Sequence, residues 1–83
     1  PALREEVWTA HYWRTRIAVE RDLAVGARVF CPQGGGRAPA DEQSARRMRW
    51  VLGAITDVSD LYKGMVAVGH RDCEVQALRV PIE

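Results

Sequence analysis

Short apolar runs separated by turn residues dominate the second half of the sequence. They occupy roughly residues 48–58, 65–69, 73–76 and 80–82, and an earlier run covers residues 27–31. Runs of this length and spacing are typical of antiparallel strands in a small barrel or sandwich. The pattern therefore predicts a mainly β domain with five antiparallel strands.

The run at residues 48–58 is the longest and is apolar on both faces. Alternate positions place Val51, Gly53 and Ile55 on one face and Trp50, Leu52 and Ala54 on the other. Because both faces are apolar, we expect other parts of the chain to cover both. Gly53 is expected to mark a bend or bulge that lets the sheet curl.

The connections between these runs carry clear turn signals. Residues 32–45 contain three glycines and two prolines, which predicts one long loop. Residues 59–64 read as a turn in which Gly64 supplies a positive φ. Residues 70–72 are expected to form a tight connection, and residues 77–79 a single 3₁₀ turn.

The sequence does not decide whether the first 22 residues form a helix or a strand. Apolar residues fall at helical spacing near the start, but a strand reading is equally good. We interpret residues 1–22 as an extended N-terminal arm, with a short helical turn at residues 18–22, and residues 23–83 as the barrel. The whole chain is expected to be a single domain.

Composition narrows the class of protein without identifying it. The chain has 83 residues, is 47% hydrophobic and 28% charged, and carries a formal net charge of +1. A nearly neutral chain has no global field that attracts nucleic acid or an anionic membrane. No apolar run approaches the ~20 residues of a membrane helix, and no signal peptide is evident. A signal peptide that has been removed would leave no trace, so the compartment stays open, with a cytoplasmic location favoured. Eleven of the twelve basic residues are arginine, as in proteins from GC-rich, bacterial-like genomes.

Cys31 and Cys73 are the only two cysteines. Each lies beside β-type residues and shares strand parity with a valine, so we expect two buried free thiols that pack as small apolar groups. A disulfide between neighbouring strands is the alternative. Two cysteines without a nearby histidine pair do not predict a metal site, and no cofactor motif is present.

Four segments carry a resemblance to the Tudor-like and Src-homology-3-like small barrel superfamily. They are residues 22–29 (Asp-Leu-Ala-Val-Gly-Ala-Arg-Val), 50–55 (Trp-Val-Leu-Gly-Ala-Ile), 64–68 (Gly-Met-Val-Ala-Val) and 78–80 (Leu-Arg-Val). The resemblance implies a core of Leu23, Val29, Val51, Ile55, Val66, Val68, Val75 and Leu78.

Tudor relatives often bind methylated lysine or arginine in an aromatic cage. The resemblance implies that Trp50 and Tyr62 would contribute to such a cage. The sequence has Gly-His-Arg-Asp at residues 69–72, where ligand-binding Tudor domains have an aspartate-tyrosine-glycine turn.

The aromatic residues are too numerous for the interior of so small a barrel. One interpretation is that the N-terminal arm crosses an outer face and packs Trp8 or Trp13 near Trp50, Leu52 or Phe30. The other is that some aromatics form an exposed patch for self-association or for a protein partner. The candidate partner-binding residues are Trp8, Tyr12, Trp13, Phe30, Trp50 and Tyr62.

Arg37, Arg46, Arg47 and Arg49 form the only basic cluster. These arginines could bind the phosphates of a nucleic acid while its bases stack on Trp50 and Tyr62. A solvated strand edge, where charges deter aggregation, is the alternative.

No motif dictates a reaction, so we do not expect an enzyme. The sequence favours a non-enzymatic protein-interaction or assembly module that forms a homo-oligomer. A nucleic-acid-binding barrel is the first alternative, and a barrel with a small-molecule pocket between subunits is the second.

Overall fold

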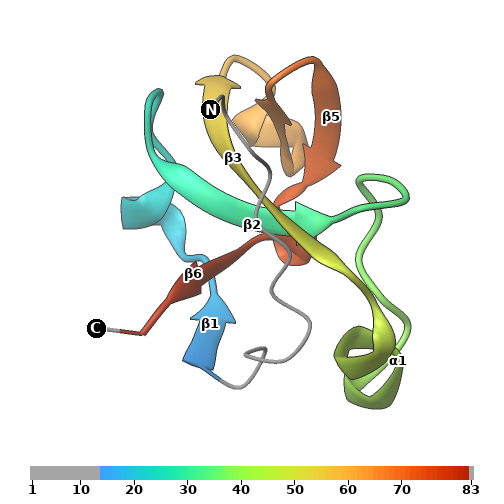
Figure 1. The fold of residues 1–83 in the computed structure, drawn as a ribbon. Helices are drawn as coiled ribbons and strands as arrows, with labels where there is room; N and C mark the ends of the chain where they lie inside the picture. The colour runs from blue at the N-terminus through green and yellow to red at the C-terminus, as the bar shows by residue number, and fades with distance from the viewer. Residues whose placement is uncertain (1–13, 83) are drawn as a thin grey trace, which may run out of the picture.

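Six antiparallel strands form one sheet in a computed structural model that describes residues 14–82 (Figure 1). The strands are β1 (Thr15–Ile17), β2 (Arg28–Pro32), β3 (Trp50–Asp57), β4 (Met65–Val68), β5 (Arg71–Glu74) and β6 (Arg79–Pro81). One α-helix, α1 (Glu42–Arg47), and three 3₁₀ turns, η2 (Glu20–Asp22), η3 (Leu61–Lys63) and η4 (Val75–Ala77), complete the described fold.

The mainly β prediction is confirmed, but the closed five-stranded barrel is wrong. The strand order is β1-β6-β2-β3-β4-β5, so β1 and β5 are two edges that do not pair with each other. The additional strand is β1, which comes from the segment predicted to be part of an arm. It joins the sheet because β6 offers it an antiparallel partner, with Arg16 opposite Val80.

The two faces of the sheet carry separate apolar clusters, as the alternation in the sequence predicts. The inner cluster contains Ala18, Leu23, Val29, Cys31, Ile55, Val66, Val68, Cys73, Leu78 and Val80. The outer cluster contains Phe30, Ala45 and Trp50, with Met48 and Leu52 packed against them. Every residue of the predicted core is buried except Val75, which is half-buried against the inner cluster.

The sheet bends slightly later along β3 than predicted. The register between β3 and β4 shifts between Ile55 and Asp57, which marks an irregularity of the β-bulge kind. Gly53 has a different role, because a Cβ at this position would lie 2.7 Å from Cγ1 of Val68. The glycine therefore allows β4 to approach the middle of β3 closely.

The predicted loop at residues 32–45 is wrong at its end, where α1 begins. The glycines and prolines of this segment all precede the helix, so they do not disrupt it. Asp41 caps the helix by accepting a hydrogen bond from the Ser44 amide at 2.8 Å. Burial of Ala45 in the outer cluster then holds α1 against the sheet.

The remaining turns form as the sequence predicts, but β5 and the 3₁₀ turn after it begin two residues earlier than expected. Gly64 has a left-handed conformation with φ of 79°, as predicted. Gly69 also has a positive φ, 65°, and with His70 it joins β4 to β5 in a two-residue hairpin loop. This tight hairpin starts β5 at Arg71 rather than at Cys73, and the following 3₁₀ turn is η4 at 75–77 rather than at 77–79.

Candidate functional site

The outer face of the sheet carries the side chains with the most varied chemistry. Phe30 lies opposite Leu52 on β3 and opposite Arg79 on β6, so these side chains share that face. Phe30 and Trp50 are each only 2% exposed. The indole Nε1 of Trp50 donates a hydrogen bond to the Ala45 carbonyl oxygen at 2.9 Å, which ties α1 to the sheet. Both aromatics therefore pack in a core layer and do not form an exposed patch.

A groove lies on this face between α1 and the β1–β6 pair. We call it the outer groove, and its volume is about 300 Å³. Its apolar lining includes Ile17, Pro39 and Trp50, and its charged lining is Asp41, Glu42 and Arg79. Ile17 is 54% exposed. The groove thus combines accessible apolar surface with charges of both signs.

Arg79 is held in place at one wall of the outer groove. Its Nε donates to Oγ1 of Thr15 at 2.7 Å and its Nη2 donates to the Thr15 carbonyl oxygen at 2.9 Å. Thr15 is buried, so both of its polar groups need such a partner. The guanidinium is a fixed feature of the groove, since two hydrogen bonds orient its planar fork.

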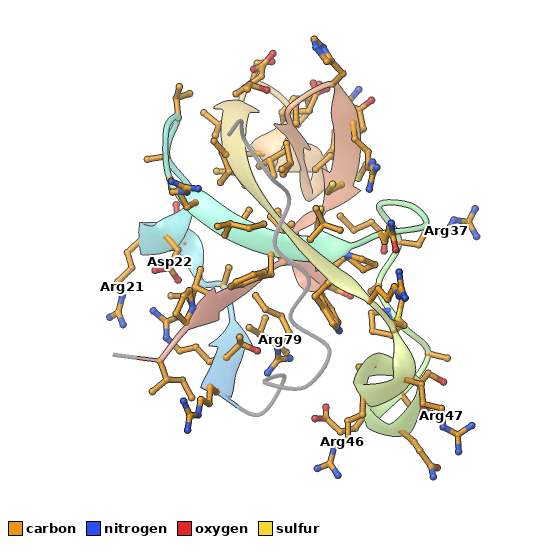
Figure 2. All side chains as sticks on the ribbon, viewed as in Figure 1. Arg21, Asp22, Arg37, Arg46, Arg47 and Arg79 are labelled. Atoms are coloured by element: carbon orange, nitrogen blue, oxygen red, sulfur yellow. The ribbon has the colours of Figure 1, made fainter. Side chains whose placement is uncertain are left out.

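Two arginine side chains cap the outer edge of β1, and Figure 2 shows one of them, Arg79, beside this strand. Ala18 and Arg14, at either end of β1, bond to Leu78 and Ile82 at either end of β6. Because hydrogen-bonded positions alternate along an antiparallel pair, the peptide groups of Thr15 and Ile17 face away from β6. Their carbonyl oxygens accept hydrogen bonds from Nη2 of Arg79 at 2.9 Å and from Nη1 of Arg16 at 3.3 Å. Capping of this kind protects an edge strand from pairing with another chain.

The opposite edge, β5, is covered by the glycine-rich segment that follows β2. The Glu74 amide donates to the Gly36 carbonyl oxygen at 2.7 Å, and the Ala38 amide donates to Oε1 of Glu74 at 2.8 Å. Nη1 of Arg71 donates to the Pro32 carbonyl oxygen at 3.2 Å. Both edges of the sheet are thus partnered by the protein's own groups.

The four arginines of the predicted basic cluster are all exposed. Arg46 and Arg47 belong to α1, and Arg37 and Arg49 flank the helix on either side in the sequence. Figure 2 shows Arg37, Arg46 and Arg47 on the same side of the molecule and pointing outward. Arg46 also makes a long contact of 3.9 Å with Glu42, one helical turn earlier.

The structure does not bring together the aromatic residues expected beside these arginines. Trp50 is buried in the outer cluster, whereas Tyr62 is 81% exposed on η3 and has Lys63 Nζ 5.6 Å from its ring centroid. Figure 1 places η3 at the end of the molecule opposite α1. The cage that the Tudor resemblance implied is therefore not formed by these two residues. The candidates Trp8, Tyr12 and Trp13 lie outside the described residues.

Three aspartates have a lowered pKa because hydrogen bonds stabilise their ionised form. Hydrogen bonds from Ser44 lower the pKa of Asp41, and hydrogen bonds from Ser59 lower the pKa of Asp57. The Arg16 side chain, with help from the Val19 amide, lowers the pKa of Asp22 to about 2. These three carboxylates stay ionised at neutral pH.

Residues 14–82 offer no group of three or more side chains suited to hold a metal ion. None of the helices in this part of the chain has the length and apolar character that crossing a bilayer requires.

Comparisons with protein-family models, with curated proteins and with solved structures gave no significant match.

Reasoning from sequence missed most of the outer groove. Asp41 could have been found, because an aspartate at the N-cap followed by an acidic residue in the first turn, here Glu42, is a common start of a helix. Arg79 and Ile17 gave no signal, since each looks like an ordinary strand residue until β1 pairs with β6.

Proposed function

We propose that this protein is a non-enzymatic assembly module that self-associates through the outer groove and the adjacent surface of α1. The observation that carries the proposal is the outer groove itself, where exposed Ile17 lies among Asp41, Glu42 and Arg79. An apolar centre with a polar rim is the usual anatomy of a protein–protein interface.

The charges of α1 favour a second copy of the same chain as the partner. The helix has Glu42 in its first turn and Arg46 and Arg47 in its last turn. When two copies pack around a two-fold axis with their helices antiparallel, the acidic end of each helix meets the basic end of the other. The net charge of only +1 adds little repulsion between the copies.

The capped strand edges support a contact between faces rather than between edges. Strand addition would have to displace Arg79 and Arg16 from β1, or the Gly36 segment from β5. Contact through the outer groove requires none of these bonds to break. The groove is small, so we expect reversible association with a dissociation constant of about 1–100 μM rather than an obligate dimer.

Sedimentation velocity of the full chain over a wide concentration range tests the proposal. Glu42→Arg should weaken association about tenfold, because the two-fold axis makes each changed charge count twice at roughly 0.2–1 kcal/mol per contact. The double variant Glu42→Arg/Arg46→Glu should restore it, since opposite charges again face each other.

Two further variants separate the groove from general surface effects. Ile17→Asp should also weaken association, whereas Val25→Asp should not, because Val25 is 64% exposed but lies outside the groove. A wild-type mass that stays monomeric at about 1 mM, far above the expected dissociation constant, would rule out self-association as the function.

Nucleic-acid binding is a second candidate, supported by the four exposed arginines around α1. Contact would be through phosphate, since Trp50 is buried and Tyr62 is remote. Titration with a labelled single-stranded oligonucleotide should then show an affinity that falls steeply with salt, and Arg46→Ala/Arg47→Ala should reduce the magnitude of the slope by about 1.4. An affinity unchanged by that double variant argues against this candidate.

A further inference from the structure

The only two cysteines of the chain lie in contact inside the inner cluster, although about 40 residues separate them in sequence. Both side chains are buried in the same cluster, and the bond from Arg71 to the Pro32 carbonyl oxygen holds the end of β2 beside β5. The neighbouring Cys31 thiol, together with burial, raises the pKa of Cys73. The Sγ of Cys73 also donates weakly to the Arg71 carbonyl oxygen at 3.8 Å.

The contact is built by tertiary structure, because the two cysteines belong to strands that are not neighbours in the sheet. Cys31 lies on β2 and Cys73 on β5, with β3 and β4 between them in the strand order. The segment after β2 crosses β5 so closely that a Cβ on Gly36 would be 2.7 Å from the Cα of Cys73. Packing alone needs small apolar side chains at these positions, and it does not need both of them to be thiols.

Access to the pair is unequal. Cys31 is 4% exposed and lines a cavity of about 450 Å³ together with Gly53, Val68 and His70. Cys73 is 0% exposed. A small oxidant that enters this cavity therefore reaches Cys31 first.

We propose that Cys31 and Cys73 form a redox pair in which a small peroxide converts the two thiols into a disulfide that locks β5 to β2. The Cys31 sulfur attacks the peroxide, the O–O bond breaks, and a sulfenic acid and one water are formed when hydrogen peroxide is the oxidant. The Cys73 sulfur then attacks the Cys31 sulfur, an S–S bond forms and the second water leaves. Two thiols are oxidised and one peroxide is reduced.

The disulfide would join β2 to β5, two strands that do not pair with each other in the sheet. In the reduced protein, hydrogen bonds from Arg71, Glu74 and Ala38 join β5 to the segment after β2. The disulfide adds a covalent bond at the same place and closes a loop of about 40 residues. Such a crosslink restricts the unfolded chain, so we expect the Tm to rise by about 15–30 °C. This inference does not depend on self-association.

The test is to treat the folded full chain with hydrogen peroxide and map the products by mass spectrometry. We expect a monomeric product that has lost two hydrogens, a crosslinked peptide containing both cysteines, and a higher Tm that returns to its starting value with dithiothreitol. Oxidation should be slow, because a buried thiol is rarely ionised. Thiols that stay intact in the folded protein during an exposure many times longer than the urea-unfolded chain needs for oxidation would overturn the proposal, as would crosslinks only between molecules.

Single variants test the order of the two steps. In Cys73→Ala, Cys31 should accumulate as a sulfenic acid that dimedone traps. In Cys31→Ala, the remaining Cys73 should stay unmodified, because it has no access to the cavity. Circular dichroism of both variants reports whether they fold, and the wild-type crosslink decides the main proposal if either does not. Faster trapping in Cys31→Ala than in Cys73→Ala would show that the assigned order is wrong.

Discussion

Replacing Gly36 with alanine tests how closely the segment after β2 packs on β5. The new Cβ would lie 2.7 Å from Cys73 Cα and closer still to the Asp72 carbonyl oxygen. Both neighbours are backbone atoms, so no side-chain rotation relieves the clash. The segment must therefore move away from β5, which strains or breaks the bond from the Glu74 amide to the Gly36 carbonyl oxygen.

The size of the effect follows from these contacts. Overpacking typically costs about 1–3 kcal/mol, and one lost backbone hydrogen bond costs about 1 kcal/mol. The lower conformational entropy of the unfolded alanine variant offsets about 0.4–1 kcal/mol of this loss. We expect the free energy of unfolding to fall by about 2 kcal/mol and the Tm by about 8–16 °C.

Gly35→Ala is the matched control, because a Cβ at Gly35 meets no atom within 4 Å and the residue has no positive φ. It should leave the stability unchanged or raise it slightly. Urea unfolding of both variants, followed by tryptophan fluorescence, gives the comparison. If Gly36→Ala and Gly35→Ala differ by less than about 0.5 kcal/mol, the close approach of this segment to β5 is refuted.

Three further changes probe the outer face and the acid stability of the fold. Trp50→Phe removes the hydrogen bond to the Ala45 carbonyl oxygen and should cost about 1–3 kcal/mol in urea unfolding; an unchanged midpoint would contradict the anchoring of α1. Arg79→Lys loses the fork that holds Thr15, so light scattering should detect faster aggregation from the uncapped β1 edge, and no increase would count against the capping role. The pKa of Asp22 is lowered to about 2 from an unfolded value of 3.8, so its contribution is complete above about pH 4 and is lost as the pH falls toward 2. Asp22→Asn should therefore flatten the dependence of stability on pH in this window, and a curve parallel to the wild type would disprove the linkage.

The apolar alternation of the sequence located five of the six strands, β2 to β6, although β5 begins two residues earlier than predicted. It placed Trp50 and Ile55 on opposite faces of β3, and both are buried, although Ala54 is exposed. The buried Val29, Ile55 and Leu78 of the inner cluster agree with the core that the family resemblance implied. Gly64 was predicted equally well, because a positive φ in a tight turn is a local requirement. Each of these features depends only on neighbouring residues, which is why the sequence alone determines it.

Tertiary structure decided the features that depend on which strands meet. The three-residue strand β1 is too short to have its own periodic signal, and it exists because β6 pairs with it. α1 needs the Asp41 cap and a site for Ala45 beside Trp50, and the outer groove exists only after both elements are in place. The contact between Cys31 and Cys73 likewise follows from the curl of the sheet, since no spacing in the sequence encodes how β2 and β5 approach each other. Local patterns select strands, whereas the order and curvature of the sheet arise from long-range packing.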